Sequence, residues 1–292
     1  MRVDATAALV FRSFLGCTLS RRKTMTSRIH NVTLHKIGVA GVEAMTLVSN
    51  HHFPRHAHDQ FGMGLIAFGA QRSWSGVGTV DAEASDMIMV NPGEIHDGIP
   101  LGGKARGWRI IYFEPATMAR LLHQEFASPV EIARPVARDP HLARSFTRLF
   151  ACLTDRYPDS LCAEELLIRA LMRLLQRHGV AAPRLGGPSP RVAGAIRRLD
   201  SAPQQPVTLA ELAAISGVSR FQLLRGFVRD IGVTPHAYLV QLRVRLARRL
   251  LAQRHTPAQA ALLAGFADQS HLTRAFVRQV GVTPGRYREA LA

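Results

Sequence analysis

Three histidines in the first half of the chain have the residue type and spacing of a binding site. His56 and His58 are two residues apart, so their side chains point to the same side if that segment is extended. His96 comes later in the chain and could converge on them across a small β-structure. Imidazole nitrogens suit divalent metals as well as small polar ligands. Three roles are therefore open for this cluster: a structural role with hydrogen bonds only, contact with a small effector, or metal binding.

Aromatic and charged side chains in the same region could complete a binding cavity. The candidate aromatic walls are Trp74, Trp108 and Tyr112. The candidate polar groups are Arg55, Glu94 and Arg109. Each of these residues taken alone is more typical of a core or a surface than of a ligand contact. The predicted effector-binding residues are His56, His58, Trp74, Glu94, His96 and Trp108.

A catalytic constellation is not apparent in the sequence. We find no Ser-His-Asp, Cys-His or phosphate-loop pattern. The three cysteines, Cys17, Cys152 and Cys162, form no C-x-x-C pair and are odd in number, which argues against a disulfide framework and a zinc ribbon. This cysteine usage is typical of a reducing cytoplasm. We therefore predict a cytoplasmic protein that is not an enzyme.

The elements that would position these side chains are β-strands followed by helices. Residues 42 to 115 contain short β-rich runs such as VEAMTLV, FGMGLIAF and WRIIYF, broken by Gly and Pro at roughly 10-residue intervals. This pattern predicts a small barrel or sandwich. Residues 139 to 178 have apolar side chains at three-to-four spacing, which predicts two helices that form a core or a helix-pair interface. The Gly- and Pro-rich stretch 179 to 190 predicts a linker.

The net charge of +16 is concentrated at the two ends of the chain. Residues 191 to 292 carry 15 Arg against 5 acidic residues, whereas residues 29 to 190 carry 16 basic and 15 acidic ones. A basic C-terminal third is typical of a protein that binds a polyanion, and nucleic acid is the leading candidate. No apolar stretch reaches the 18 or so residues of a membrane span, so no membrane partner is expected. Residues 1 to 28 are expected to be a disordered tail or an extension upstream of the true start.

An internal repeat dominates the basic C-terminal part. With an offset of 49 residues, LLRGFVRDIGVTPHAY (223–238) matches LTRAFVRQVGVTPGRY (272–287) at ten of sixteen positions. A short Ala-rich helical segment ending in Gly precedes each copy. The repeated helices are expected to start after the capping residues Ser219 and Asp268 and to stop at Gly232 and Gly281. The repeated unit is therefore helix, Gly turn, helix.

Such a unit is a helix-turn-helix, in which the second helix lies in the major groove of DNA. In the first copy, Leu223 and Phe227 are four residues apart and are expected to pack inward. Their expected partners on the preceding helix are Leu212 and Ile215. The equivalent residues of the second copy are expected to do the same, which leaves the opposite face of each second helix for DNA.

The outward-facing residues at the start of each second helix are the ones that can reach base edges. Arg225 and Arg274 occupy equivalent positions in the repeat and suit bidentate hydrogen bonds to guanine. The predicted DNA-contacting residues are Phe221, Gln222, Leu224, Arg225, Gln269, Ser270, His271, Thr273 and Arg274. If the connecting helix holds both copies about 34 Å apart on one face, they would enter successive major-groove segments of double-stranded DNA. A helical bundle with arginines on its solvated face would explain one copy, but two copies and the basic charge favour DNA.

The C-terminal hundred residues resemble the DNA-binding module of the AraC family of bacterial transcription regulators. The run GFADQSHLTRAFVRQVGVTPGRYR (265–288) is similar to that family's signature, with Leu272 where an aromatic is frequent and Val277 where Lys is frequent. The resemblance implies promoter binding, usually as an activator. It also implies a homodimer joined through the N-terminal part and makes RNA polymerase a candidate partner.

The N-terminal part resembles the same family's cupin-type sensing domain over roughly residues 45 to 115. The residues that carry this resemblance are FPRHAHDQFGMGLIAFG (53–69) and DMIMVNPGEIHDG (86–98). Metal-binding cupins place a Glu four or five residues after the second His, and this chain has Gly62 and Met63 there. We therefore predict no bound metal and no cofactor.

These observations predict an α+β chain with four parts. They are a tail (1–28), a cupin-like β-barrel with a helical pair for effector sensing and dimerisation (29–178), a linker (179–190) and an all-α domain with two helix-turn-helix motifs (191–292). The predicted function is sequence-specific DNA binding that regulates transcription in response to a small molecule. The alternative is a metal-dependent cupin enzyme that carries an accessory DNA-binding module.

Overall fold

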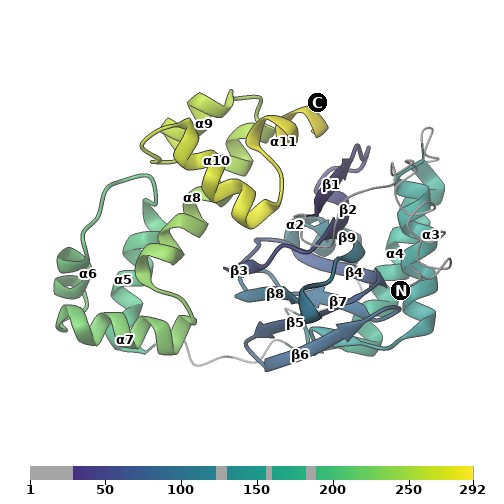
Figure 1. Cartoon of the computed structure of the whole chain (residues 1–292), viewed down its shortest axis with the longest axis horizontal. Coiled ribbons are helices and arrows are strands. Elements are labelled where there is room, and N and C mark those ends of the chain that lie inside the picture. The colour runs from purple at the N-terminus through teal and green to yellow at the C-terminus, as the bar shows by residue number, and fades with distance from the viewer. Residues whose placement is uncertain (1–28, 123–129, 156–159, 182–188, 292) are drawn as a thin grey trace.

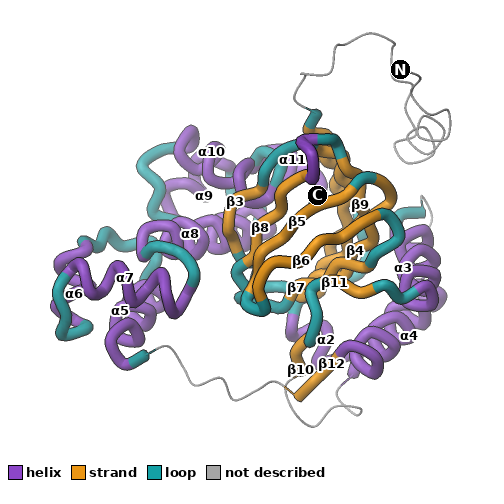
Figure 2. The backbone as a smooth tube through the Cα atoms, turned by 60° about the horizontal axis from the view of Figure 1, so that its bottom comes forward, coloured by secondary structure: helices purple, strands orange, loops and turns teal. Residues whose placement is uncertain are grey.

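The computed structural model describes residues 29–122, 130–155, 160–181 and 189–291 (Figure 1). The predicted tail, residues 1 to 28, and most of the predicted linker lie outside these ranges. A part built of strands and helices is followed by a part built of helices, which confirms the α+β class (Figures 1 and 2). No helix in the described ranges is long and apolar enough to cross a membrane.

The strands form two main antiparallel sheets. The larger sheet has the order β1 (His30–His35), β2 (Val42–Ser49), β9 (Arg106–Phe113), β4 (Phe61–Phe68), β7 (Met87–Val90) and β11 (Val136–Ala137). The smaller sheet has the order β3 (Phe53–His56), β8 (His96–Pro100), β5 (Ala70–Ser75) and β6 (Gly78–Glu83). A separate pair joins β10 (Val130–Ile132) to β12 (Gly179–Ala181), so the first residues of the predicted linker pair with a strand.

The predicted closure into a barrel is wrong, because the two sheets share no strand pairing. The short strand β3 pairs with β8 alone, and its register shifts between Phe53 and His56. The sheets instead pack face to face as a sandwich whose core includes Phe53 from the smaller sheet and Ile66 and Trp108 from the larger one. The region therefore has the second of the two architectures that its strand pattern indicates.

Alternate residues of the larger sheet face two different cores. In β9, Trp108 and Ile110 face the smaller sheet, while Ile111 and Phe113 face a layer of helices. These helices are α2 (Pro115–Leu122), α3 (Pro140–Leu153) and α4 (Ser160–His178). Because successive side chains of a strand point to opposite faces, burial on both sides explains why these strands are apolar throughout. The leucine stripes of α3 and α4 are buried in this layer, as their spacing predicts.

The C-terminal part is entirely helical in its described residues. It contains α5 (Pro190–Ser201), α6 (Leu209–Ile215), α7 (Arg220–Ile231), α8 (Pro235–Ala252), α9 (Pro257–Leu263), α10 (Gln269–Val280) and α11 (Pro284–Ala290). The long helix α8 connects the two helix-turn-helix units, α6–α7 and α9–α10 (Figure 1). The predicted repeat is thus confirmed as a pair of structural units.

Local capping chemistry sets the ends of the two second helices. The Ser219 and Asp268 side chains accept hydrogen bonds from backbone N–H groups in the first turns of α7 and α10. Gly232 and Gly281 end these helices with φ angles of 84° and 87°, a left-handed conformation that glycine adopts without steric cost. The predicted starts and stops are confirmed.

The packing of the first unit departs from the prediction at one residue. Leu223 and Phe227 are buried against Leu212, as expected. Ile215 is 48% exposed and does not join this core. It is the last residue of α6, and its side chain lies over Gly194 of α5 instead of between α6 and α7.

Candidate functional site

The predicted DNA-contacting side chains lie on accessible faces of α7 and α10. The exposed ones are Phe221, Gln222, Leu224, Arg225, Gln269, Ser270 and Arg274, and the half-buried ones are His271 and Thr273. The opposite faces of the two helices are buried through Phe227 and Phe276. Each second helix therefore exposes one face and packs the other into its own core, and the exposed face of α7 includes the apolar side chains of Phe221 and Leu224.

Some of these side chains already form local contacts. The Gln222 side chain accepts a hydrogen bond from the Ser219 backbone N–H and completes a capping box. The Thr273 hydroxyl donates to the Gln269 carbonyl within α10. The Arg225 guanidinium lies over the Phe221 ring, 5.5 Å from its centroid. Gln222, Thr273 and Arg225 thus each have a partner within their own helix-turn-helix unit.

A cavity of about 100 Å³ lies between the two sheets and is bordered on one side by the helical domain. Five of the six predicted effector-binding residues line it: His56, His58, Glu94, His96 and Trp108. The lining also includes Tyr112, Arg106 and Gln71, and from the helical domain Arg248, Gln279 and Val280. The apolar part of its wall comes largely from the larger sheet, through Met45, Leu47, Ile88 and Ile110.

Trp74 is not among the residues that line this cavity. It lies on a second hollow, between the smaller sheet and α7, where the Arg55 guanidinium stacks 3.7 Å from the centroid of its ring. Gly232, at the end of α7, packs against the same ring. The structure therefore places Trp74 at the contact between the two domains rather than with the histidines.

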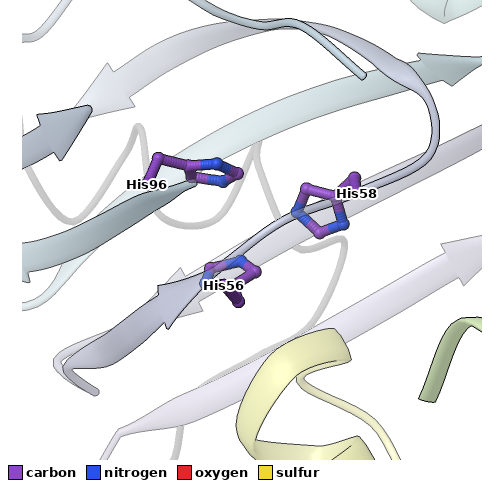
Figure 3. A group of neighbouring side chains, drawn as sticks. All are labelled: His56, His58 and His96. Atoms are coloured by element: carbon purple, nitrogen blue, oxygen red, sulfur yellow. The ribbon is translucent and has the colours of Figure 1, made fainter. Parts of the chain in front are cut away.

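The three histidines lie close together (Figure 3), and all three line the cavity. One ring nitrogen from each lies within 4.8 Å of those of the other two. The distances between ring centroids are 4.5 Å for His56 and His96, 4.9 Å for His56 and His58, and 5.2 Å for His58 and His96. His56 ends β3 and His96 begins β8, and these two residues face each other in the strand pairing.

The surroundings keep the three rings neutral. Burial, followed by repulsion from His96, lowers the pKa of His56 to about 3, although a hydrogen bond to Pro54 opposes this shift. Burial and the two neighbouring histidines lower the pKa of His58 well below its ordinary value. Burial also lowers the pKa of His96. At neutral pH all three imidazoles therefore carry no charge and can accept a hydrogen bond or bind a ligand.

This burial predicts a loss of stability in mild acid. Below about pH 6.5 the unfolded chain takes up protons at these histidines and the folded chain does not, so the free energy of unfolding falls as the pH falls. His56 contributes down to its folded pKa of about 3. In this range, neutral burial of His56 lowers the free energy of unfolding by up to about 1.4 kcal/mol for each unit by which the pH falls. Urea unfolding at several pH values in metal-free buffer should show a shallower pH dependence for His56→Asn than for the exposed control His52→Asn. Equal slopes for both variants would contradict the assignment.

A fully buried arginine borders the cavity. The Arg106 guanidinium donates hydrogen bonds to the Gln71 side chain and to the backbone oxygens of Ser49, His51 and Gly98, over 3.0–3.2 Å. Burial lowers its pKa to about 10, so it stays charged at neutral pH. Among the described residues it bonds to carbonyl and amide oxygens and not to a carboxylate. Its role is to tie the two sheets together, and nothing in the local sequence pattern distinguishes it from a surface arginine.

An ionic cluster joins the two domains. Arg248 of α8 donates to both Glu43 carboxylate oxygens at 2.9 and 3.0 Å and to the Gln60 side chain at 2.8 Å. The Tyr287 hydroxyl of α11 donates to Glu43 at 2.8 Å. Nearby, Arg245 forms a 2.9 Å ion pair with Asp59. The sequence did not indicate this cluster, because its members are up to 244 residues apart in the chain.

The sheet domain also contacts the ends of both second helices at equivalent positions. Arg55 donates to the Gly232 carbonyl at 2.9 Å, and the His30 Nε2 group donates to the Gly281 carbonyl at 2.8 Å. These two glycines are 49 residues apart, the offset of the repeat. The carboxyl ends of α7 and α10 are thus both held by the sheet domain.

Comparisons with known proteins identify the same two domains. Residues 37–171 match the AraC-like ligand binding domain family, and residues 212–290 match a helix-turn-helix domain family. A Streptomyces lividans protein named as an AraC-like transcription regulator is 35% identical over 223 residues, which cover 73% of this chain and 70% of that protein. The HTH-type transcriptional regulator YbfI of Bacillus subtilis (strain 168) is 29% identical over 224 residues, which cover 75% of this chain and 81% of YbfI.

A solved structure shares the arrangement of both domains. Unsaturated fatty acid bound ToxT from Vibrio cholerae strain SCE256 superposes with a TM-score of 0.52 at 13% identity, covering 92% of this chain and 97% of that one. At this level of identity the likeness concerns the fold. Together with the two domain matches and the Streptomyces relative, it leads to one conclusion: this chain belongs to the AraC-like family of helix-turn-helix transcription regulators.

Proposed function

We propose that this regulator reads DNA with α7 and α10 together, and that a small molecule held between the two sheets controls the reading. The observation that carries the proposal is the pair of equivalent helices, each with an exposed face at its start and with its end held by the sheet domain. In this proposal Arg225 and Arg274 bond to base edges, and neighbouring arginines of the +10 C-terminal third contact phosphates.

The electrostatic part of the proposal predicts a steep salt dependence. If the chain neutralises roughly six to ten phosphates, its affinity for DNA should fall about 10³- to 10⁵-fold between roughly 50 and 200 mM salt. Fluorescence anisotropy with a labelled duplex, selected from random DNA by the full chain, measures this slope. A flat response would mean that the basic C-terminal third does not neutralise the DNA backbone.

The volume of the cavity limits the size of the effector that it can hold without a structural change. A volume of about 100 Å³ is well below the roughly 300–1,000 Å³ of pockets for drug-sized ligands. The similar ToxT structure holds a bound unsaturated fatty acid, but a long-chain ligand would require the present cavity to enlarge. We propose a small polar molecule with an apolar portion, since histidines line one part of the wall and aliphatic side chains line another.

Strand β3 provides a direct route from the cavity to the DNA-reading helices. His56 faces the cavity, while the adjacent Arg55 bonds to Gly232 at the end of α7. Phe53 of the same strand lines the cavity and lies close to Gly281 at the end of α10. An effector that shifts β3 would therefore change how both helices are held. Binding of the effector in the cavity would in this way change the affinity of the protein for DNA.

The remaining parts of the proposal follow from the family. We propose a homodimer joined through the sheet domain, acting in the cytoplasm as an activator in contact with RNA polymerase. The regulator names of the relatives support this function over the alternative of a metal-dependent cupin enzyme. A thermal-shift screen of small metabolites, followed by DNA binding with each hit, tests the sensor role. Hits that stabilise the chain without changing its DNA affinity would contradict it.

A further inference from the structure

The two equivalent helices α7 and α10 differ in the chemistry of their exposed faces. On α7, Phe221, Leu224 and Val228 are 66%, 37% and 43% exposed. Their spacing of three and then four residues places them on one side of the helix, where they form an apolar stripe. The exposed large apolar side chains of the described residues include none from α10. The first helix therefore has an apolar face that its repeat partner lacks.

The offset of the repeat shows which residue of α10 stands at each of these positions. Ser270 is the equivalent of Phe221, 49 residues further along the chain. By the same offset, Thr273 is the equivalent of Leu224. A small hydroxyl side chain on α10 thus replaces a large apolar one on α7 at both positions. The next residue is an arginine in both copies, so the difference concerns the apolar positions and not the charged one.

Packing within the protein does not account for the start of this stripe. The core of the unit takes Phe227 from another side of α7. The Phe221 ring lies against the Arg225 guanidinium but stays largely exposed. Val228, at the far end of the stripe, borders the hollow beside the smaller sheet. Phe221 and Leu224 are the part left for a partner, and large apolar side chains exposed together typically mark an interaction surface.

The position of the two side chains indicates what that partner offers. They lie in the first two turns of α7, the part of a second helix that reaches base edges in the major groove. Neither phenylalanine nor leucine has a side-chain group that donates or accepts a hydrogen bond. The apolar group that unmodified DNA presents in the major groove is the C5 methyl of thymine. A thymine methyl is therefore the group that complements these two side chains.

We propose that Phe221 and Leu224 read thymine methyl groups, so that the half of the DNA site under α7 contains thymine beside the base pair bound by Arg225. The half under α10 is read by polar side chains instead. This inference rests on the proposed function, because it requires α7 to enter the major groove. Its consequence is a chemically asymmetric site for one chain, and the asymmetry sets the direction in which the chain lies along the DNA.

The test replaces thymine with deoxyuridine, which lacks the methyl group and keeps the hydrogen-bonding groups of the base. Anisotropy titrations use the full chain with the selected duplex and with duplexes that carry deoxyuridine at one thymine position each. We expect at least one position where the loss of the methyl group weakens binding about fourfold, which corresponds to about 0.8 kcal/mol for one buried methyl-sized group.

Two variants assign this loss to α7. Phe221→Ala and Leu224→Ala should each bind the thymine and deoxyuridine duplexes equally at the position that the replaced side chain contacts. Both side chains are exposed, so both variants should fold, and far-UV circular dichroism with the thermal midpoint checks this. Ser270→Ala, at the position of α10 equivalent to Phe221, is the matched control and should keep the full deoxyuridine effect.

Two results would overturn the proposal. One is a site at which no thymine is sensitive to deoxyuridine, and the other is a sensitivity that persists unchanged in both Phe221→Ala and Leu224→Ala. Preference of the unmodified chain for the selected duplex over random DNA, measured in the same titrations, would then leave the proposed function standing. Absence of that preference would contradict the proposed function itself.

Discussion

Replacing Arg274 with alanine is expected to weaken binding to the selected DNA site by about 5- to 150-fold, equivalent to about 1–3 kcal/mol. The same loss is expected for Arg225→Ala, because the two arginines are equivalent in the repeat and both are exposed on their helices. A bidentate arginine–guanine contact is made with one base pair, so each variant should also tolerate substitution of that base pair better than the unmodified chain does. Anisotropy titrations against the site and its single-base variants measure both effects.

The control for these variants is Arg148→Ala. Arg148 is an exposed arginine of α3, in the sheet domain, and its removal changes the net charge by the same amount. It should leave both affinity and sequence preference unchanged. If Arg274→Ala weakens binding to all sequences equally, then Arg274 holds a phosphate and base reading must be assigned to other residues of α10.

Replacing Arg248 with methionine is expected to destabilise the chain by about 3–5 kcal/mol. The substitution leaves Glu43 without its ion pair at a site where the two side chains are only 13% and 16% exposed. It also removes the hydrogen bonds to Gln60 and Tyr287. Breaking one partner of a buried pair is costly because the remaining charge has lost its compensation. Urea unfolding followed by circular dichroism gives the change.

The neighbouring substitution Arg249→Met is the matched control. Arg249 is in the same turn of α8, but its side chain is 63% exposed and lies 3.9 Å from Asp59. Exposed pairs contribute about 0–1 kcal/mol, so little change is expected. Equal effects of the two substitutions would mean that the cluster around Glu43 does not hold the domains together.

The features that the sequence predicted correctly depend on local chemistry. A Ser or Asp cap sets the first residue of α7 and α10, and a Gly in the left-handed conformation ends each helix. Both effects act within one helical turn, so the local sequence shows them. The inward faces follow from helical periodicity, as Leu223 and Phe227 show. The sequence predicted the convergence of the three histidines, but alternation along a strand is not its cause, since His58 lies beyond the end of β3 and His56 meets His96 through the pairing of β3 with β8.

The features that the sequence could not reveal depend on contacts between distant segments. Trp74 is an aromatic residue on a strand like Trp108, and only the packing of α7 against it shows that it serves the domain contact. Arg248 is one of many arginines in α8, and its burial follows from the position of Glu43 on β2. The prediction of a closed barrel was wrong for the same reason, because closure requires pairing between distant strands that no local pattern specifies.

One chain is expected to place two equivalent helices in successive major-groove segments on one face of DNA. Methylation interference on the selected site, with guanines modified at N7 in the major groove, tests it most directly. We expect two clusters of interfering guanines per chain, about 10–10.5 base pairs apart. Arg225→Ala should remove part of one cluster, and Arg274→Ala should remove part of the other. A single cluster per chain, or two clusters that both respond only to Arg274→Ala, would contradict it.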